Sequence, residues 1–251
     1  MRNTNAMAIV LLGAFSGFSL AGEYRNQQEF LAELSGGQHI ITFDNLAHGT
    51  IVGEQGSGTL WVSFLETGRV WNEQDNPSGG SWKSPPNVLW NWNPPGPIKF
   101  CFRRPVDGVG FYNASIADRE RVKLFDKDGQ MLFEGQLSEN SVNFLGYITD
   151  GNPIARGEVV GIPPETFGTI FIDDFSFGFR TIRCYLPADL VNDGVLNTLD
   201  FGLLATCFAG PGVPSSNCPQ GSCGLSLIDG DDDVDLHDFA VFQRSLGSSC
   251  Q

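Results

Sequence analysis

The sequence predicts a mainly β protein with a small helical domain at its carboxyl end, and three observations point to it. Short segments of alternating apolar and polar residues recur between residues 22 and 183. The chain holds 31 Gly and 14 Pro, and long runs with helical apolar spacing are few. From Cys184 onward the composition changes, with nine Asp, no Glu and one basic residue in 68 positions. We therefore divide the chain into residues 1–21, 22–183 and 184–251.

Residues 1–21 are predicted to be a secretory signal peptide. Residues 7–20 are apolar, and the small residues Ser19 and Ala21 fit a cleavage site before Gly22. This apolar stretch of 14 residues is short for a membrane span, which needs about 20. We expect a secreted, extracellular protein, or one held at the cell surface through a partner, with no membrane contact after cleavage.

The net charge excludes some classes of partner. The chain carries 15 basic and 29 acidic residues, a formal net charge of -14. Such a chain repels phosphate backbones and anionic lipid, and the nearest approach to a basic patch is the single pair Arg103-Arg104. We expect no nucleic-acid partner, whereas cations such as calcium are favoured.

Residues 22–183 are predicted to form one short helix followed by a series of strands. In residues 98–103, Ile98, Phe100 and Phe102 share one face, and the other face carries Cys101, which we expect to be accessible. A hairpin turn is predicted at residues 126–129. Many short strands at this spacing are typical of an antiparallel β-sandwich. The helix is expected over 27–34, and the strands over 39–43, 59–64, 98–103, 108–113, 121–126, 130–135, 142–148, 157–162 and 169–177.

Only residues 65–97 break this rhythm, and they are too long for an ordinary connection, so they are either functional or a wandering strand. All five Trp fall between residues 61 and 92. Flat rings beside Asn and Asp suit sugar binding, but long loops also bury Trp as a small core of their own. Both interpretations stay open: a coplanar, exposed arrangement favours a sugar site, and inward rings favour packing. The candidate ligand-binding residues are Trp71, Trp82, Trp90 and Trp92.

The C-terminal segment contains an internal repeat, in which residues 189–200 align with residues 227–238. Each copy is a twelve-residue loop followed by apolar residues at helical spacing. Oxygen ligands at positions 1, 3, 5, 7, 9 and 12 of such a loop wrap one calcium ion, position 7 through its backbone carbonyl. The candidate ligands are Asp189, Asp193, Val195, Asn197 and Asp200 in the first loop, and Asp229, Asp231, Asp233, Asp235 and Asp238 in the second.

Residues 184–251 resemble a type I dockerin, through the first-loop pattern Asp189-x-x-x-Asp193-Gly194-x-x-Asn197-x-x-Asp200. The departures are Val191 at position 3, Leu227 at position 1 of the second loop, and Asp232 where Gly is usual. The resemblance implies two calcium loops, each followed by a helix, and docking onto a cohesin-type partner through Thr198-Leu199 and Leu236-His237. The alternatives are a decayed, metal-free repeat and a calcium-stabilised cap without a partner.

The even number of cysteines predicts disulfides in an oxidising compartment. Five of the six lie in residues 184–251, a segment too short to bury a large core. Six cysteines allow 15 pairings, so the sequence leaves the pairing open. Our working prediction joins Cys184 to Cys250, Cys207 to Cys218 and Cys101 to Cys223.

Residues 27–178 resemble secreted bacterial β-sandwich domains of jelly-roll type, similar in architecture to galactose-binding-like carbohydrate modules. The motifs that carry this resemblance are residues 41–46, 49–53, 84–87, 105–112 and 172–178. The resemblance implies a calcium ion joining the first and last strands, with Asp44, Asp173 and Asp174 as candidate ligands; the alternative is that the three are ordinary strand-end carboxylates.

We expect a non-catalytic protein: a β-sandwich that binds carbohydrate, joined to a calcium module that attaches it to a partner. The three His are scattered, and neither Gly-x-Ser-x-Gly nor His-Glu-x-x-His occurs. Two alternatives stay open. One is a secreted polysaccharide-degrading enzyme, a glycoside hydrolase using two of Glu54, Glu66, Glu73 and Glu120; the other is a purely structural cell-surface protein.

Overall fold

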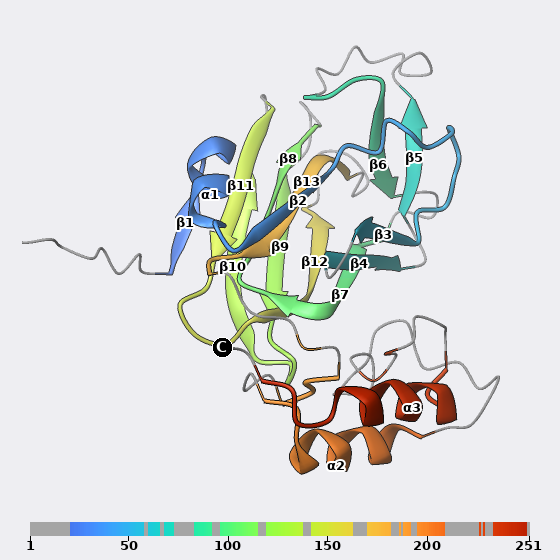
Figure 1. The fold of residues 1–251 in the computed structure, drawn as a ribbon. Coiled ribbons are helices and arrows are strands. Elements are labelled where there is room, and N and C mark those ends of the chain that lie inside the picture. Colours follow the sequence, from blue (N-terminus) through green and yellow to red (C-terminus); the bar gives the residue numbers. More distant parts are fainter. Residues whose placement is uncertain are drawn as a thin grey trace, which may run out of the picture.

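The chain forms two antiparallel sheets and a separate pair of helices at one end of them (Figure 1). This computed structural model describes residues 21–57, 60–65, 68–72, 83–91, 96–114, 119–137, 142–162, 170–181, 186, 188–191, 195–208, 226, 228 and 233–249. The predicted signal peptide lies outside this range except for Ala21. Among the described residues, none of the helices combines the length and the apolar character needed to cross a bilayer.

The first sheet, sheet A, has β13 near its middle. Its strands run in the order β1 (Gly22–Tyr24), β11 (Asn143–Ile148), β8 (Gly108–Asn113), β13 (Phe171–Phe179), β6 (Asn87–Asn91) and β5 (Gly68–Asn72). Strand β2 (Gly37–Ile41) also pairs with β13, aligning Ile41 with Phe175.

The second sheet, sheet B, lies against sheet A. Its order is β10 (Met131–Leu137), β9 (Glu120–Phe125), β12 (Ile154–Gly161), β7 (Ile98–Val106), β4 (Leu60–Leu65) and β3 (Glu54–Ser57). Strand β12 is antiparallel to both neighbours, so that Glu158 faces Lys99 on one side and Lys123 on the other.

The core lies between the two sheets and is rich in Phe. Alternation along β7 turns Phe100 and Phe102 inward, as predicted, and both are almost fully buried. Their rings pack edge to face or offset against Phe175 of β13, with centroids 4.9 and 6.4 Å away. Two antiparallel sheets enclosing one shared core confirm the predicted β-sandwich.

A short helix covers one end of the outer face of sheet A. Helix α1 (Gln27–Glu33) begins at Asn26, whose side chain accepts hydrogen bonds from the first-turn amides. Phe30 and Leu34 pack on Phe144 of β11 in a small second core. Gly146 makes this contact possible, since a Cβ there would lie 2.6 Å from the Phe30 ring. The opposite end of this face, over β5 and β6, is not covered by α1.

The irregular stretch 65–97 contains two strands that the sequence did not predict, β5 and β6, which pair with each other. Of the two interpretations of residues 65–97, the one that placed strand in this stretch is therefore correct for residues 68–72 and 87–91. Strand β6 then joins β13 through the pairs Phe171–Trp90 and Ile172–Leu89. The missed strands β5 and β6 thus form one edge of sheet A.

The C-terminal segment has its own core. Helices α2 (Thr198–Cys207) and α3 (Leu236–Ser245) lie side by side (Figure 1), with the Phe201 and Phe239 rings 5.7 Å apart. The buried residues of this core include Leu190, Leu196, Leu204, Val234 and Phe242.

Candidate functional site

The two halves of the C-terminal module have similar hydrogen bonds around the Asp at position 12, with the loop donor at position 3 in the first half and at position 2 in the second. The buried Asp200 carboxylate accepts the amides of Val191 at 2.9 Å and Asn197 at 2.8 Å. Its counterpart Asp238, also buried, accepts the amides of Ile228 at 2.6 Å and Asp235 at 2.9 Å. In both halves the position-12 Asp therefore ties the start of the loop to the start of the helix behind it.

The position-9 residues begin the helices. Asn197 accepts the Leu199 amide at 2.7 Å, and Asp235 accepts the His237 amide at 2.6 Å. Each forms a capping box with the Asp three residues later. Asn197 and Asp235 therefore cap helices, a role beyond the metal ligation that loop spacing predicts for them.

The described residues of each loop are compatible with a bound cation, but they do not form a complete metal-binding site by themselves. In the first loop, each oxygen of Asp200 accepts one backbone amide, and a carboxylate oxygen has two lone pairs, so Asp200 has the capacity to bind a hard cation as well. No group of three or more His, Cys, Asp or Glu side chains arranged to hold a metal occurs among the described residues. Asp193, Asp229 and Asp231 lie outside them.

The end of the chain closes the first loop. Val195 bridges Ser249, and the Leu196 amide donates to the Ser248 carbonyl at 3.0 Å. Two leucines in the first turns of the helices stay outside the core: Leu199 is 63% exposed and Leu236 is 73% exposed. Both belong to the pairs expected to contact a partner.

Two of the predicted tryptophans come together on the outer face of sheet A, at the end away from α1. Trp71 and Trp90 are both half-buried, with ring centroids 4.3 Å apart and planes at 76°. Trp90 also stacks on Phe171 of β13, and His48 lies edge-on to Trp71. The rings are neither coplanar nor turned fully inward, while Trp82 and Trp92 lie outside the described residues. Phe171 joins this aromatic cluster through strand pairing alone, which local sequence does not reveal.

Asparagines hold the strands beneath this aromatic cluster in place. The Asn72 side chain donates to Asn87 at 2.9 Å. The buried Asn87 in turn donates to the carbonyls of Asp44 and Leu46. Arg69 of β5 pairs with Trp90 of β6, and its side chain donates to the Gly49 carbonyl at 3.1 Å. Polar groups therefore flank the rings, although Asn87 is structural.

Asp44, Asp173 and Asp174 are structural carboxylates at strand ends rather than the calcium ligands that the resemblance implied. Asp173 Oδ1 accepts from Ser84 Oγ and the Asp174 amide, and Oδ2 accepts from the amides of Lys83 and Ser84. These four bonds occupy the lone pairs of a carboxylate. Ser84 Oγ also contacts Asp174, and Asp44 accepts the Asn87 amide. These acids therefore hold residues 83–87 on sheet A.

Asp173 is fully buried, and its acidity is altered as a result. Burial raises its pKa to about 6, with the charge of Asp174 adding to the rise, although hydrogen bonds from Ser84 and Asp174 act in the opposite direction. Residues 83–87 therefore rest on a carboxyl group that gains a proton in mildly acidic solution.

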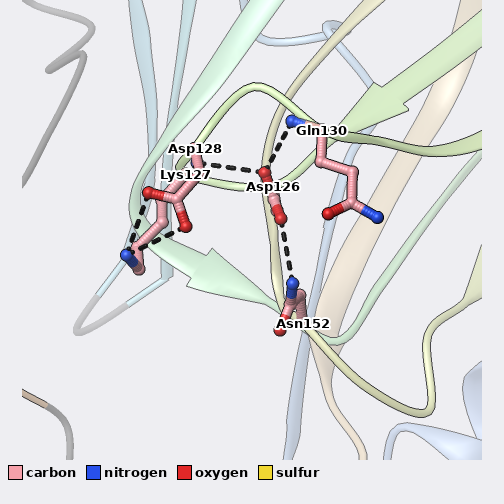
Figure 2. Close-up of polar contacts among 5 residues, drawn as sticks. All are labelled: Asp126, Lys127, Asp128, Gln130 and Asn152. Atoms are coloured by element: carbon pink, nitrogen blue, oxygen red, sulfur yellow. Dashed lines mark hydrogen bonds and ion pairs between the residues drawn. The ribbon is translucent and has the colours of Figure 1, made fainter.

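A cavity of about 210 Å³ lies between the sandwich and the C-terminal module, lined by residues of both, including Pro105, Pro153, Leu186 and Leu190. Asp126 lies at its polar side, and Figure 2 shows its carboxylate holding the β9–β10 turn. It accepts the Asp128 and Gln130 amides and the Asn152 side chain at 2.8–3.0 Å. Gly129 has a φ of +83°, which confirms the predicted turn. The Asp126 carboxylate thus stabilises the turn through these three hydrogen bonds.

The cysteines link the two parts of the chain. Cys101 and Cys207 are disulfide-bonded, and no described cysteine is free. Every other cysteine lies in residues 184–250, so the bond of Cys101 joins the sandwich to the C-terminal segment. Cys101 is only 3% exposed, so the expectation that it is accessible is wrong: a disulfide partner covers an outward-facing sulfur. Cys184, Cys218, Cys223 and Cys250 lie outside the described residues, and the pairing stays a prediction.

Comparison with known proteins gives distant structural neighbours. No family model and no curated protein matches the chain. The K2 adhesin domain of Lys-gingipain is 12% identical, with a TM-score of 0.36 over 56% of this chain and 99% of that one. A family 29 carbohydrate-binding module in complex with mannohexaose is 12% identical, with a TM-score of 0.35 over 60% and 98%. The β-sandwich assignment follows from the strand pairing of this chain itself.

Proposed function

We propose that the chain is a secreted, non-catalytic binding protein whose β-sandwich binds carbohydrate on the outer face of sheet A. The observation that carries this proposal is the aromatic cluster of Trp71, Trp90 and Phe171, whose rings are partly exposed on the outer face of sheet A. Aromatic rings supply apolar contact area, and the neighbouring Arg69 and Asn72 supply donors for hydroxyl groups.

A glycan array with the intact chain tests this function. The proposal predicts binding without release of reducing sugar, and loss of binding in Trp71→Ala. Phe133→Ala is the matched control, because Phe133 is another half-buried ring, stacked on Tyr147 at the edge of the sandwich. Equal loss in both variants, or turnover of the bound glycan, would contradict the proposal.

A second proposal concerns attachment: the C-terminal module binds one calcium ion per loop and docks onto a cohesin-type partner. The hydrogen bonds of Asp200 and Asp238 support it, since in both halves the Asp at position 12 joins the beginning of the loop to the residue that caps the helix. The exposed Leu199 and Leu236 supply apolar contacts for a partner. Calcium, when bound, neutralises the acidic loops and fixes their backbone.

Calorimetry and partner capture separate these two steps. Calcium titrated into the intact chain should give saturable heat that magnesium does not reproduce. Leu199→Asp with Leu236→Asp should keep this calcium heat and lose binding to an immobilised cohesin domain. If calcium gives no heat at millimolar concentration, the metal proposal fails. If the leucine variant still binds the cohesin, the docking surface is wrong.

A further inference from the structure

A single serine hydroxyl lies between two buried carboxylates just before the start of β6. Ser84 Oγ is 2.9 Å from Asp173 Oδ1 and 2.7 Å from Asp174 Oδ1. Asp173 is fully buried, and Asp174 is 8% exposed. A hydroxyl group carries one proton, so it can donate to only one of these two oxygens at a time. With both carboxylates charged, the other short contact would join two acceptors.

A proton on Asp173 removes this conflict. Oδ2 of Asp173 accepts the amides of Lys83 and Ser84, so the proton belongs on Oδ1, the oxygen that faces the serine. This Oδ1–H group donates to Ser84 Oγ, and the Ser84 hydroxyl donates to Asp174. Each of the two short contacts then joins a donor to an acceptor. Burial acts in the same direction, because it raises the pKa of Asp173 to about 6, with the charge of Asp174 adding to the rise.

The other charged or titratable groups that the described residues place around this corner are already engaged. On β8, Tyr112 pairs with Asp173, and Lys83 Nζ lies 5.2 Å from the centroid of the Tyr112 ring. Asp44 accepts the first amide of β6 at 3.1 Å. On its β6 side, this part of β13 meets the buried, apolar Leu89. The Lys83 cation is thus directed to an aromatic ring, and the two acids are joined through the serine.

The same corner supports both strands of the aromatic cluster. Residues 83–84 lead into β6, which begins at Asn87 and carries Trp90 three residues later. The Asn87 side chain accepts a hydrogen bond at 2.9 Å from Asn72, the last residue of β5 and the one after Trp71. A displacement of residues 83–84 would therefore be transmitted to both tryptophans.

From this geometry we propose that Asp173, Ser84 and Asp174 form a proton-sharing bridge, and that this bridge makes carbohydrate binding at the aromatic cluster depend on pH. The inference rests on the proposed function, since it concerns the regulation of that same site. The bridge is complete in mildly acidic solution. As the pH rises through about 6 and the proton leaves, the two carboxylates repel each other and Ser84 keeps one of its two contacts. Residues 83–84 then lose part of their support, and glycan affinity falls.

Two measurements on the intact chain test the bridge and its consequence separately. Carbon-13 NMR follows the Asp173 carboxyl without any glycan, and its titration should have a midpoint near pH 6. Isothermal titration with the glycan selected on the array should give an affinity about threefold weaker at about pH 7.5 than at about pH 5, the scale expected for one lost hydrogen bond.

Asp174→Asn is the variant that isolates the shared proton. Asp174 has a φ of +46°, a conformation that Asn adopts readily, so the fold should be kept. An amide side chain at this position can either accept from Ser84 or donate to it, so both protonation states of Asp173 keep the contact. The Asp173 midpoint should therefore fall to lower pH, and glycan affinity should no longer change with pH. Asp150→Asn is the control, because it removes the same charge at an exposed residue, and it should behave as the wild type.

Three outcomes would overturn the inference. They are an Asp173 midpoint near the ordinary value of 3.8, a glycan affinity that is equal at the two pH values, and a pH dependence that survives in Asp174→Asn. Absence of glycan binding at every pH would instead contradict the proposed function, and the carboxyl titration would still decide whether the bridge exists.

Discussion

Asp200 and Asp238 each accept two backbone amides, one from the start of their own loop and one from the residue that caps the helix behind it. Both carboxylates are fully buried. The bond to the capping residue is equivalent in the two halves, whereas the loop donor is at position 3 in the first half and at position 2 in the second. Each half of the C-terminal module therefore depends on one Asp.

Replacing that Asp should loosen the module. Asp238→Ala leaves the amides of Ile228 and Asp235 buried without their acceptor and removes half of a capping box. We expect a loss of about 2 kcal/mol in the free energy of unfolding, measured by urea denaturation in the absence of calcium. Asp128→Ala is the control, because Asp128 is exposed, and it should change stability by no more than about 0.5 kcal/mol. Equal stability of the two variants would contradict the structural role of Asp238.

Asp173 should make stability depend on mildly acidic pH. Because burial raises its pKa from 3.8 to about 6, the folded chain binds a proton more readily than the unfolded chain between these values. The contribution of Asp173 to the free energy of unfolding is therefore complete below about pH 4. It is lost as the pH rises to about 6, by on the order of 3 kcal/mol.

Asp173→Asn isolates this contribution from that of the other carboxyl groups. The variant cannot titrate at this position, and its amide nitrogen cannot accept the amides of Lys83 or Ser84, so it should be less stable than the wild type. The stability difference between wild type and variant should shrink from pH 4 to pH 6. A difference that stays constant over this range would show that the pKa of Asp173 is not raised.

Gly178 should tolerate no side chain. A Cβ at this position of β13 would lie 2.1 Å from the carbonyl oxygen of Gly37 in β2, a backbone atom that cannot rotate away. Gly178→Ala should therefore push β2 from the sheet and cost about 3 kcal/mol or more. Gly151→Ala, where a Cβ would meet nothing within 4 Å, should unfold at nearly the wild-type temperature. A thermal melt compares the two, and an unchanged melt for Gly178→Ala would refute the close approach.

The sequence predicted the strands whose apolar residues alternate, and missed those whose burial depends on distant partners. Strand β9 alternates between buried and more exposed residues, and the sequence of β7 alternates over residues 98–103, because one face of each strand lies in the core. Strand β3 (EQGS) has no large apolar residue, and β6 (NVLWN) is bounded by asparagines that resemble loop residues. These strands form because neighbouring strands supply hydrogen-bond partners, which local patterning does not encode.

The sequence predicted those parts of the candidate sites whose residues lie close together along the chain. The duplicated loops and the helices behind them follow from spacing within twelve residues. The four hydrogen bonds of Asp173 come largely from residues 83 and 84, about 90 positions earlier, so no local pattern distinguishes it from a metal ligand. Phe171 meets Trp90 for the same non-local reason.

Carbohydrate binding by the aromatic cluster is the central claim, and the dissociation constant of the glycan selected on the array tests it most directly. Isothermal titration of the intact chain should give one saturable site, and Trp71→Ala should weaken it at least about tenfold, since a stacking ring contributes about 1–3 kcal/mol. The Phe133→Ala control should retain the wild-type constant. A glycan affinity unchanged by Trp71→Ala would contradict the assignment of this cluster as the binding site.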